Sequence, residues 1–153
     1  CYGEAVFMLK DKLAKITQSY WLLGLAQVIH SMEETYTELY LKLNLMIEVL
    51  HQLLPWFPLV EISADMFAIF NYLMIALILG SVPVTEQGKR LGFVLMWGWA
   101  VIEILNGAFH ISTWVFLHTY FPGGVSGPIL FVLSIFFIQQ LQATPKQVTQ
   151  EVK

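Results

Sequence analysis

Long apolar runs alternate with short polar segments along most of the chain. A helix needs about 20 mostly apolar residues to cross a bilayer. Four runs meet or approach this length: residues 14–32, 66–84, 91–117 and 124–141. Pro83 is expected to close the second run, and the Pro-Gly-Gly sequence at 122–124 is expected to form the turn that opens the fourth. The pattern predicts an all-α fold, a polytopic membrane four-helix bundle.

The segment 36–60, between the first two runs, has a different pattern. Its apolar residues recur at helical spacing, and its polar residues fill the other side. The apolar set is Leu39, Leu43, Met46, Leu50 and Leu53, and the polar set is Glu38, Lys42, Glu48 and Gln52. This predicts an additional amphipathic helix in the membrane interface. An equal alternative is that the segment continues the first helix beyond the bilayer. Residues 1–153 are predicted to form a single integral membrane domain.

The composition favours a membrane protein. Hydrophobic residues make up 57% of the chain and charged residues only 12%, against about 25% charged residues in an average soluble domain. The net charge of −3 offers no basic surface for nucleic acid. A single cysteine, Cys1, excludes a disulfide framework or a thiolate metal site within the chain.

The lysines and arginines predict the orientation of the bundle. Seven of the eight fall before or at the start of the first run, between the second and third, or after the fourth, and only Lys42 falls on the other side. Because cytoplasmic loops carry an excess of Lys and Arg, both termini are expected to lie in the cytoplasm.

Two polar groups interrupt the apolar pattern. Glu33 and Glu34 follow His30 by three and four residues, so they flank its face of a helix. In the third run, Glu103, Asn106 and His110 form one stripe at spacings of three and then four. At 1.5 Å per residue, His30 lies roughly 21 Å along its helix from Ile16, and Glu103 and His110 lie roughly 18 Å and 28 Å along theirs from Leu91, so the depths overlap. Since the two helices enter from the same side, the groups are expected to meet in the non-cytoplasmic half of the membrane.

Ionisable groups in a bilayer cost at least about 2.5–3.5 kcal/mol each on insertion scales, and a metal ion would compensate for them. Imidazoles and carboxylates are ordinary ligands of zinc, iron and manganese. We therefore predict one divalent ion of this kind, held by His30, Glu33 (or Glu34) and His110. The predicted catalytic groups are Glu34, Glu103 and Tyr120, with Asn106 as a further polar group. Two simpler interpretations stay open. His30, Glu33 and Glu34 could be solvated at the water interface, and Glu103, Asn106 and His110 could form hydrogen bonds between helices without any chemistry.

The same residues resemble a known family. His30-Ser-Met-Glu33-Glu34, Asn106-Gly-Ala-Phe-His110 and Tyr120-Phe-Pro122-Gly123 are similar, in this order, to the motifs of the HXXEE-domain family of small bacterial integral membrane proteins. The resemblance implies a multi-pass protein of the bacterial inner membrane and the same choice of site residues. It supplies no reaction.

Three hypotheses about function follow. The first is a metal-dependent membrane enzyme that acts on a lipid or other hydrophobic substrate at a His/Glu/Asn site between the first and third runs. The second is a non-catalytic lipid-, pigment- or quinone-binding protein, or a small subunit that contacts other membrane protein subunits. The third is a proton or ion relay, a role that intramembrane Glu and His chains play in pumps.

Overall fold

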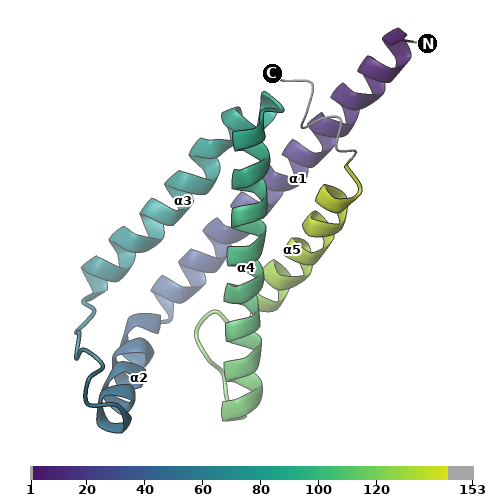
Figure 1. The fold of residues 1–153 in the computed structure, drawn as a ribbon. Helices are drawn as coiled ribbons and strands as arrows, with labels where there is room; N and C mark the ends of the chain where they lie inside the picture. Colours follow the sequence, from purple (N-terminus) through teal and green to yellow (C-terminus); the bar gives the residue numbers. More distant parts are fainter. Residues whose placement is uncertain (1, 145–153) are drawn as a thin grey trace.

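The computed structural model describes residues 2–144, and every regular element in this range is a helix (Figure 1). The five helices are α1 (Tyr2–Tyr36), α2 (Leu39–Leu53), α3 (Ala64–Glu86), α4 (Arg90–Leu117) and α5 (Ser126–Gln142). The predicted all-α fold is therefore confirmed over the described part of the chain.

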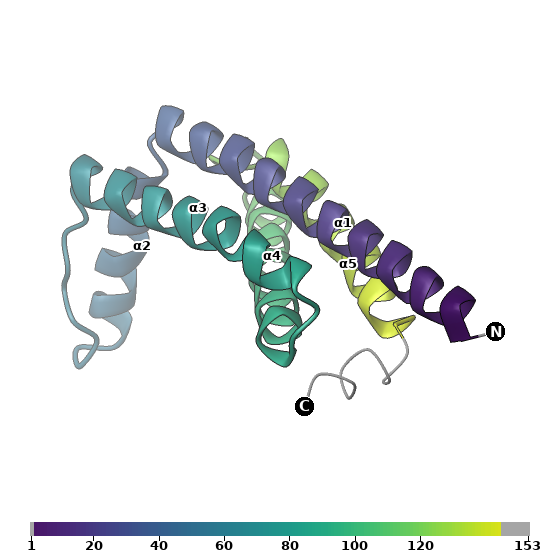
Figure 2. The ribbon, with the colours of Figure 1, turned by 90° about the horizontal axis from the view of Figure 1, so that it is seen from above.

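Four of the helices share one core. Helix α1 packs against α3 and α5, and α4 packs against α3 and most extensively against α5. Their buried apolar side chains form a single cluster with members from all four helices, such as Tyr20, Ile78, Met96 and Leu130. Figure 2 shows α1 and α3 seen lengthwise, with α4 crossing them steeply. Helices α1 and α4 both begin at the end of the molecule that holds the α3–α4 turn (Figure 1), which agrees with the expected parallel course.

Helix α2 lies apart, at the opposite end of the bundle (Figures 1 and 2). Glu38 adopts a left-handed conformation with φ of 56°, and it separates α2 from α1. The alternative that residues 36–60 continue the first helix is therefore wrong, because α1 ends at Tyr36 and α2 runs in a different direction (Figure 2). A second, smaller core of Leu39, Phe67 and Phe121 joins the start of α2 to the start of α3 and to the loop before α5.

The loop from α2 to α3 is held by one side chain of α2. The Asn44 carboxamide donates to the carbonyl oxygen of Ile62 at 3.0 Å and accepts from the Ile62 backbone N–H at 2.9 Å. These paired bonds satisfy both backbone groups of Ile62 and hold the loop against α2.

The end of α3 differs from the sequence-based expectation. Pro83 lies inside the helix, which continues to Glu86. Gly88, with φ of 65°, follows the helix in the left-handed conformation that commonly terminates helices. Pro83 lacks a backbone N–H, but it lies in the last turn of α3, so it disrupts few of the helical hydrogen bonds. The end of the helix is therefore set by Gly88 and not by Pro83.

Two of the described helices, α3 and α4, are long and apolar enough to cross a membrane. Helix α5 is apolar but has 17 residues, and α1 carries polar residues within its apolar stretch. The predicted spans at 66–84 and 91–117 thus lie in helices suited to crossing a bilayer.

Candidate metal site

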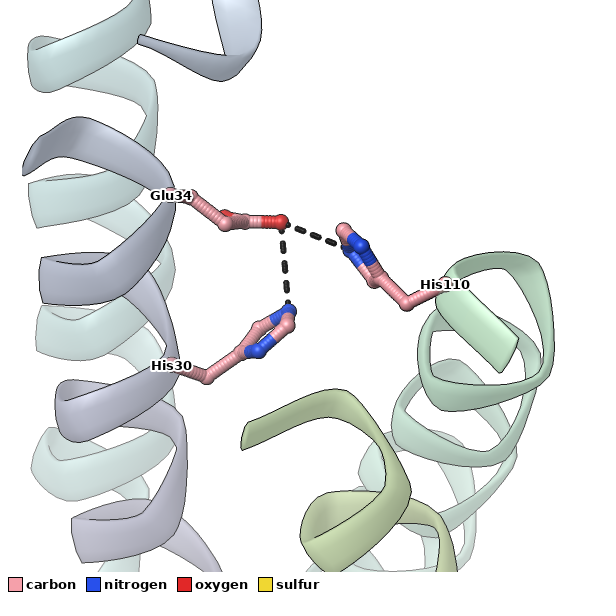
Figure 3. Close-up of side chains that lie close together, drawn as sticks. All are labelled: His30, Glu34 and His110. Carbon is pink, nitrogen blue, oxygen red and sulfur yellow. Dashed lines mark hydrogen bonds and ion pairs between the residues drawn. The ribbon is translucent and has the colours of Figure 1, made fainter. Parts of the chain in front are cut away.

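Three buried side chains from two helices converge at one point (Figure 3). Oε1 of Glu34 lies 3.1 Å from Nε2 of His30 and 3.0 Å from Nε2 of His110. The two imidazole rings meet edge to face with their centroids 4.7 Å apart. One potential ligand atom from each residue lies within 4.8 Å of the other two. We call His30, Glu34 and His110 the triad.

The local sequence explains how the triad forms. His30 and Glu34 are four residues apart on α1, so they project from the same face. His110 comes from the corresponding depth of α4, as the two polar stripes predicted. Both histidines are 0% exposed and Glu34 is 6% exposed, so the triad is shielded from solvent within the described chain.

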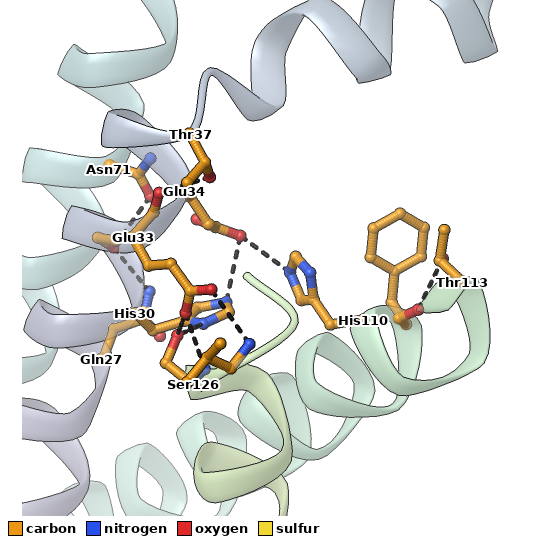
Figure 4. Close-up of polar contacts among 12 residues, drawn as sticks. Gln27, His30, Glu33, Glu34, Thr37, Asn71, His110, Thr113 and Ser126 are labelled. Carbon is orange, nitrogen blue, oxygen red and sulfur yellow. Dashed lines mark hydrogen bonds and ion pairs between the residues drawn. The ribbon is translucent and has the colours of Figure 1, made fainter. Parts of the chain in front are cut away.

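Glu33 has a different role from its neighbour (Figure 4). Its carboxylate accepts four hydrogen bonds: from the Tyr120 hydroxyl at 2.8 Å, from the backbone N–H of Val125 at 3.1 Å, from the backbone N–H of Ser126 at 2.7 Å, and from the Ser126 hydroxyl. Ser126 begins α5, so Glu33 places a negative charge at the N-terminus of that helix, where it is stabilised. The carboxylate beside the histidines is therefore Glu34 and not Glu33, whose acceptor positions are already occupied.

The electrostatics at this edge of the bundle follow from the same contacts. Burial alone would raise the pKa of Glu33, but the hydrogen bonds from Ser126, Tyr120 and Val125 outweigh it and hold the pKa below its ordinary value. Partial burial and the bond to Glu33 raise the pKa of Tyr120. The pair therefore consists of a carboxylate and a protonated phenol at neutral pH.

Ser126 connects Glu33 to the triad. Nδ1 of His30 lies 2.8 Å from the Ser126 hydroxyl oxygen. That hydroxyl has one proton and donates it to Glu33, so it accepts the Nδ1–H of His30. This arrangement leaves the lone pair of neutral His30 on Nε2, the atom that faces Glu34. A metal-binding histidine has this tautomer when its other nitrogen donates to a neighbouring oxygen.

Two ring nitrogens of the triad lack hydrogen bonds to any described residue. They are Nε2 of His30 and Nδ1 of His110. Nε2 of His30 is close to Glu34, but the direction from the ring nitrogen to the carboxylate does not suit a hydrogen bond. A nitrogen lone pair that faces a carboxylate is repelled by it unless a cation lies between the two. Buried polar atoms are rarely left unpartnered, and a cation between Nε2 of His30 and Glu34, or a further proton on His30, would satisfy both groups.

Glycines of α4, of α5 and of the loop before α5 allow His110 to reach the triad. Gly123 adopts φ of 80°, and a Cβ atom there would clash with Cε1 of His110. A Cβ atom on Gly127 would lie 2.8 Å from Cβ of His110, and one on Gly107 would lie 2.7 Å from the carbonyl oxygen of Gly127. The Pro-Gly-Gly turn thus packs directly on the imidazole ring of His110.

The remaining predicted residues lie around the triad rather than in it. Glu103 is 0% exposed. With its amide nitrogen turned toward Glu103, Gln27 donates to Oε2 at 2.9 Å and accepts from the Ser31 hydroxyl at 3.1 Å. Tyr120 binds Glu33, and Asn106 is half-buried. The catalytic roles assigned to Glu34, Glu103 and Tyr120 stay predictions.

A cavity of about 310 Å³ adjoins the triad. Its polar wall comes from α1, α3 and α4: Gln27, Glu34, Asn71, Asn106 and His110. Its apolar wall comes from α2, α3 and α4: Leu39, Leu43, Phe67, Phe70, Met74, Ile102 and Phe109. Two of the three triad residues therefore border a space that a small molecule can enter.

Ser126 and Gln27 are the polar residues that sequence reasoning missed. Ser126 stands two residues after Gly124, and a serine that closely follows such a turn is a common signal for the start of a helix. Ser126 is the first residue of α5, after the N-cap Val125. Gln27 lies three residues before His30, on a neighbouring line of the same helix face. Neither position alone indicates contact with the triad.

The fold and the triad define an all-helical protein with a buried His–Glu–His cluster between two of its helices. The family described as "Protein of unknown function with HXXEE motif" matches residues 21–138. The chain belongs to this family, and the motif is His30 to Glu34. No curated protein and no solved structure matches the chain.

Proposed function

We propose that this chain is a multi-pass membrane protein that holds one divalent metal ion at His30, Glu34 and His110. The ion, zinc, iron or manganese, would serve a reaction on a lipid or another hydrophobic substrate. The observation that carries the proposal is the triad itself: three buried ligand atoms within 4.8 Å of one another, one of which is an unpartnered imidazole nitrogen.

The membrane part of the proposal is supported by the outer surface of the helices. Large apolar side chains are exposed along α3, α4 and α5, among them Phe70, Leu77, Leu105 and Phe136, which are 59–65% exposed. Soluble monomers rarely expose apolar patches of more than a few hundred Å². A four-span bundle of α1, α3, α4 and α5, with α2 in the interface, would cover this surface with lipid.

The proposed orientation has both termini in the cytoplasm. The start of α1, the α3–α4 turn and the end of α5 share one end of the molecule (Figure 1). The side chain of Lys12 donates to the carbonyl oxygen of Ala143 at this end. Of the basic residues of the predicted cytoplasmic side, Lys12 and Lys15 lie in the first half of α1, and Lys89 and Arg90 lie at the α3–α4 turn, as the positive-inside rule expects.

The ligand set suits particular chemistry. Two imidazoles and one carboxylate leave coordination positions open, as in catalytic zinc and non-haem iron sites. When bound, the ion would supply an activated water or a redox centre. The chain itself contributes Ser126 and Glu33, which hold the His30 tautomer, and Glu34, His110 and Asn106, which border the cavity.

Metal content of the purified protein tests the proposal. We expect about one equivalent of zinc, iron or manganese in the wild type and background levels in the double variant His30→Ala/His110→Ala. The matched control is His51→Ala/His118→Ala, which removes the two histidines outside the triad and should retain the metal. Background metal in a folded wild type would contradict the proposal.

That negative result would favour the second candidate, a non-catalytic lipid-, pigment- or quinone-binding protein or a subunit of a larger complex. One observation supports this candidate: the 3.0 Å hydrogen bond between His110 and Glu34 joins α4 to α1. In that case the triad serves as a polar contact between the helices.

Cysteine labelling tests the orientation in intact cells, in a Cys1→Ser background. A membrane-impermeant maleimide should label Thr119→Cys, in the loop before α5, and should label Gln87→Cys, in the α3–α4 turn, only after the cells are opened. Both residues are exposed. The reverse pattern would overturn the proposed orientation.

A further inference from the structure

The cavity beside the triad has a polar group that no described residue satisfies. Asn71, on α3, is 4% exposed and lines the cavity. Its Oδ1 lies 3.0 Å from the Ser31 hydroxyl oxygen, and its Nδ2 has no partner among the described residues. An unpaired buried amide group is costly, so this atom favours pairing with a molecule in the cavity.

The hydrogen bonds around Ser31 decide what the ligand must offer. The Ser31 hydroxyl has one proton, which it donates either to Asn71 or to Gln27. Figure 4 shows Asn71 and Gln27 near the triad. In the first case the free group of Asn71 is an N–H donor, and in the second, with the amide reversed, it is a carbonyl acceptor. A hydroxyl group both donates and accepts, so it matches either arrangement.

The walls of the cavity limit the rest of the ligand. Among the described residues that line it there is no lysine or arginine, so a phosphate head group would find no counter-charge. A volume of about 310 Å³ corresponds to roughly ten waters at about 30 Å³ each, which is too small for a whole two-chain lipid.

The cavity also has an apolar exit. Phe70 and Ile102 line it, and they are 59% and 42% exposed on the outer surface of α3 and α4. An apolar chain can therefore leave between these helices while a small head stays inside. In the proposed membrane setting this exit would face the acyl chains of the bilayer.

We propose that the cavity binds a single-chain amphiphile with a neutral hydroxyl head, which pairs with Asn71 beside Glu34 and His110. Only the idea that this molecule is the substrate rests on the proposed function. Binding to Asn71 and to the apolar wall does not require the metal.

Photolabelling of the full chain tests the proposal. The probe is 1-dodecanol with a diazirine in mid-chain, applied to protein freed of metal with a chelator, and labelled peptides are identified by mass spectrometry. We expect labels in Phe67–Met74 and near Ile102, with competition by 1-dodecanol but not by dodecane. Labels confined to other surfaces, or equal competition by dodecane, would overturn the proposal.

Two variants make the test specific. Asn71→Leu keeps the approximate volume but removes the polar group, and we expect it to lower labelling about three- to tenfold, the effect of one neutral hydrogen bond. Ser81→Ala, which changes another buried polar residue of α3 away from the cavity, should label as the wild type does. If Asn71→Leu does not fold, Met74→Trp fills the cavity instead and should abolish labelling.

The outcome is separable from the metal proposal. Unchanged labelling in a folded Asn71→Leu or Met74→Trp variant overturns the hydroxyl-amphiphile site, even if the metal content is as expected. Loss of labelling in these variants supports the site, even if the wild type binds no metal.

Discussion

Ser126 offers a sharp test of how the triad is held, because it contacts His30 without belonging to the triad. The substitution Ser126→Ala removes the hydroxyl that lies 2.8 Å from Nδ1 of His30. The backbone N–H of residue 126 still donates to Glu33, at 2.7 Å in the wild type. The variant therefore retains a backbone hydrogen bond to Glu33 at the start of α5 but frees the His30 ring.

The expected magnitude follows from this loss. A buried Nδ1–H without an acceptor costs about 1–3 kcal/mol, and the His30 ring loses the contact that fixes its tautomer. Removing such a partner of a metal-binding histidine typically weakens metal affinity by about 10–100-fold. We expect the zinc dissociation constant to rise by the same factor, which corresponds to about 1.4–2.8 kcal/mol.

The assay is zinc competition with a chromophoric chelator on the detergent-purified protein. Ser134→Ala is the matched control, since Ser134 is also a buried serine of α5 but bonds only the carbonyl oxygen of Leu130, at 2.8 Å. Its zinc affinity should equal that of the wild type. Equal affinities for Ser126→Ala and Ser134→Ala, with both variants folded, would refute the role assigned to Ser126.

Two further predictions each compare two residues of the same type that have different surroundings. Glu34→Gln should lose the metal, whereas Glu33→Gln should keep about one equivalent. Glu33→Gln should also melt at a lower temperature, because the α5 N-terminus loses a charged acceptor that is stabilising by about 0.5–2 kcal/mol. Metal loss in both variants would contradict this division. Gly123→Ala should be destabilised, by at least about 1–2 kcal/mol from its left-handed backbone together with the contact on His110. Gly98→Ala, with nothing within 4 Å of the added Cβ atom, should instead be neutral or more stable by about 0.5–1 kcal/mol, and thermal unfolding in detergent distinguishes the two.

Helical spacing and rise predicted the main contact of the site. The spacing predicted that His30 shares a helix face with one of the two glutamates that follow it, and the matching depth of His110 predicted that these groups meet. Both quantities are properties of a regular helix, and they hold here because neither helix is interrupted before its site residue.

The choice between Glu33 and Glu34 could not be made from the same geometry. Adjacent residues on a helix flank the line through His30 on its two sides, so the spacing treats them almost alike. The choice depends on where the N-terminus of α5 lies, which is a tertiary contact across more than 90 residues of sequence. The packing of Gly123 on His110 could not be predicted either, because it is also a tertiary contact.

The elements between the helices were harder to predict than the helices. The amphipathic pattern identified α2, but it did not reveal the left-handed Glu38 that separates α2 from α1, since a glutamate rarely adopts this conformation. Pro83 was overestimated as a stop signal, because a proline near the end of a helix has little helix left to disrupt.

The most direct test of the metal site is X-ray absorption spectroscopy of the protein loaded with one equivalent of zinc. We expect a first shell of nitrogen and oxygen at about 2.0–2.2 Å, with the outer-shell scattering of two imidazoles from His30 and His110. This imidazole signal should fall by half in His110→Ala. A zinc shell without imidazole scattering, or an identical spectrum in the variant, would contradict a metal site at the triad.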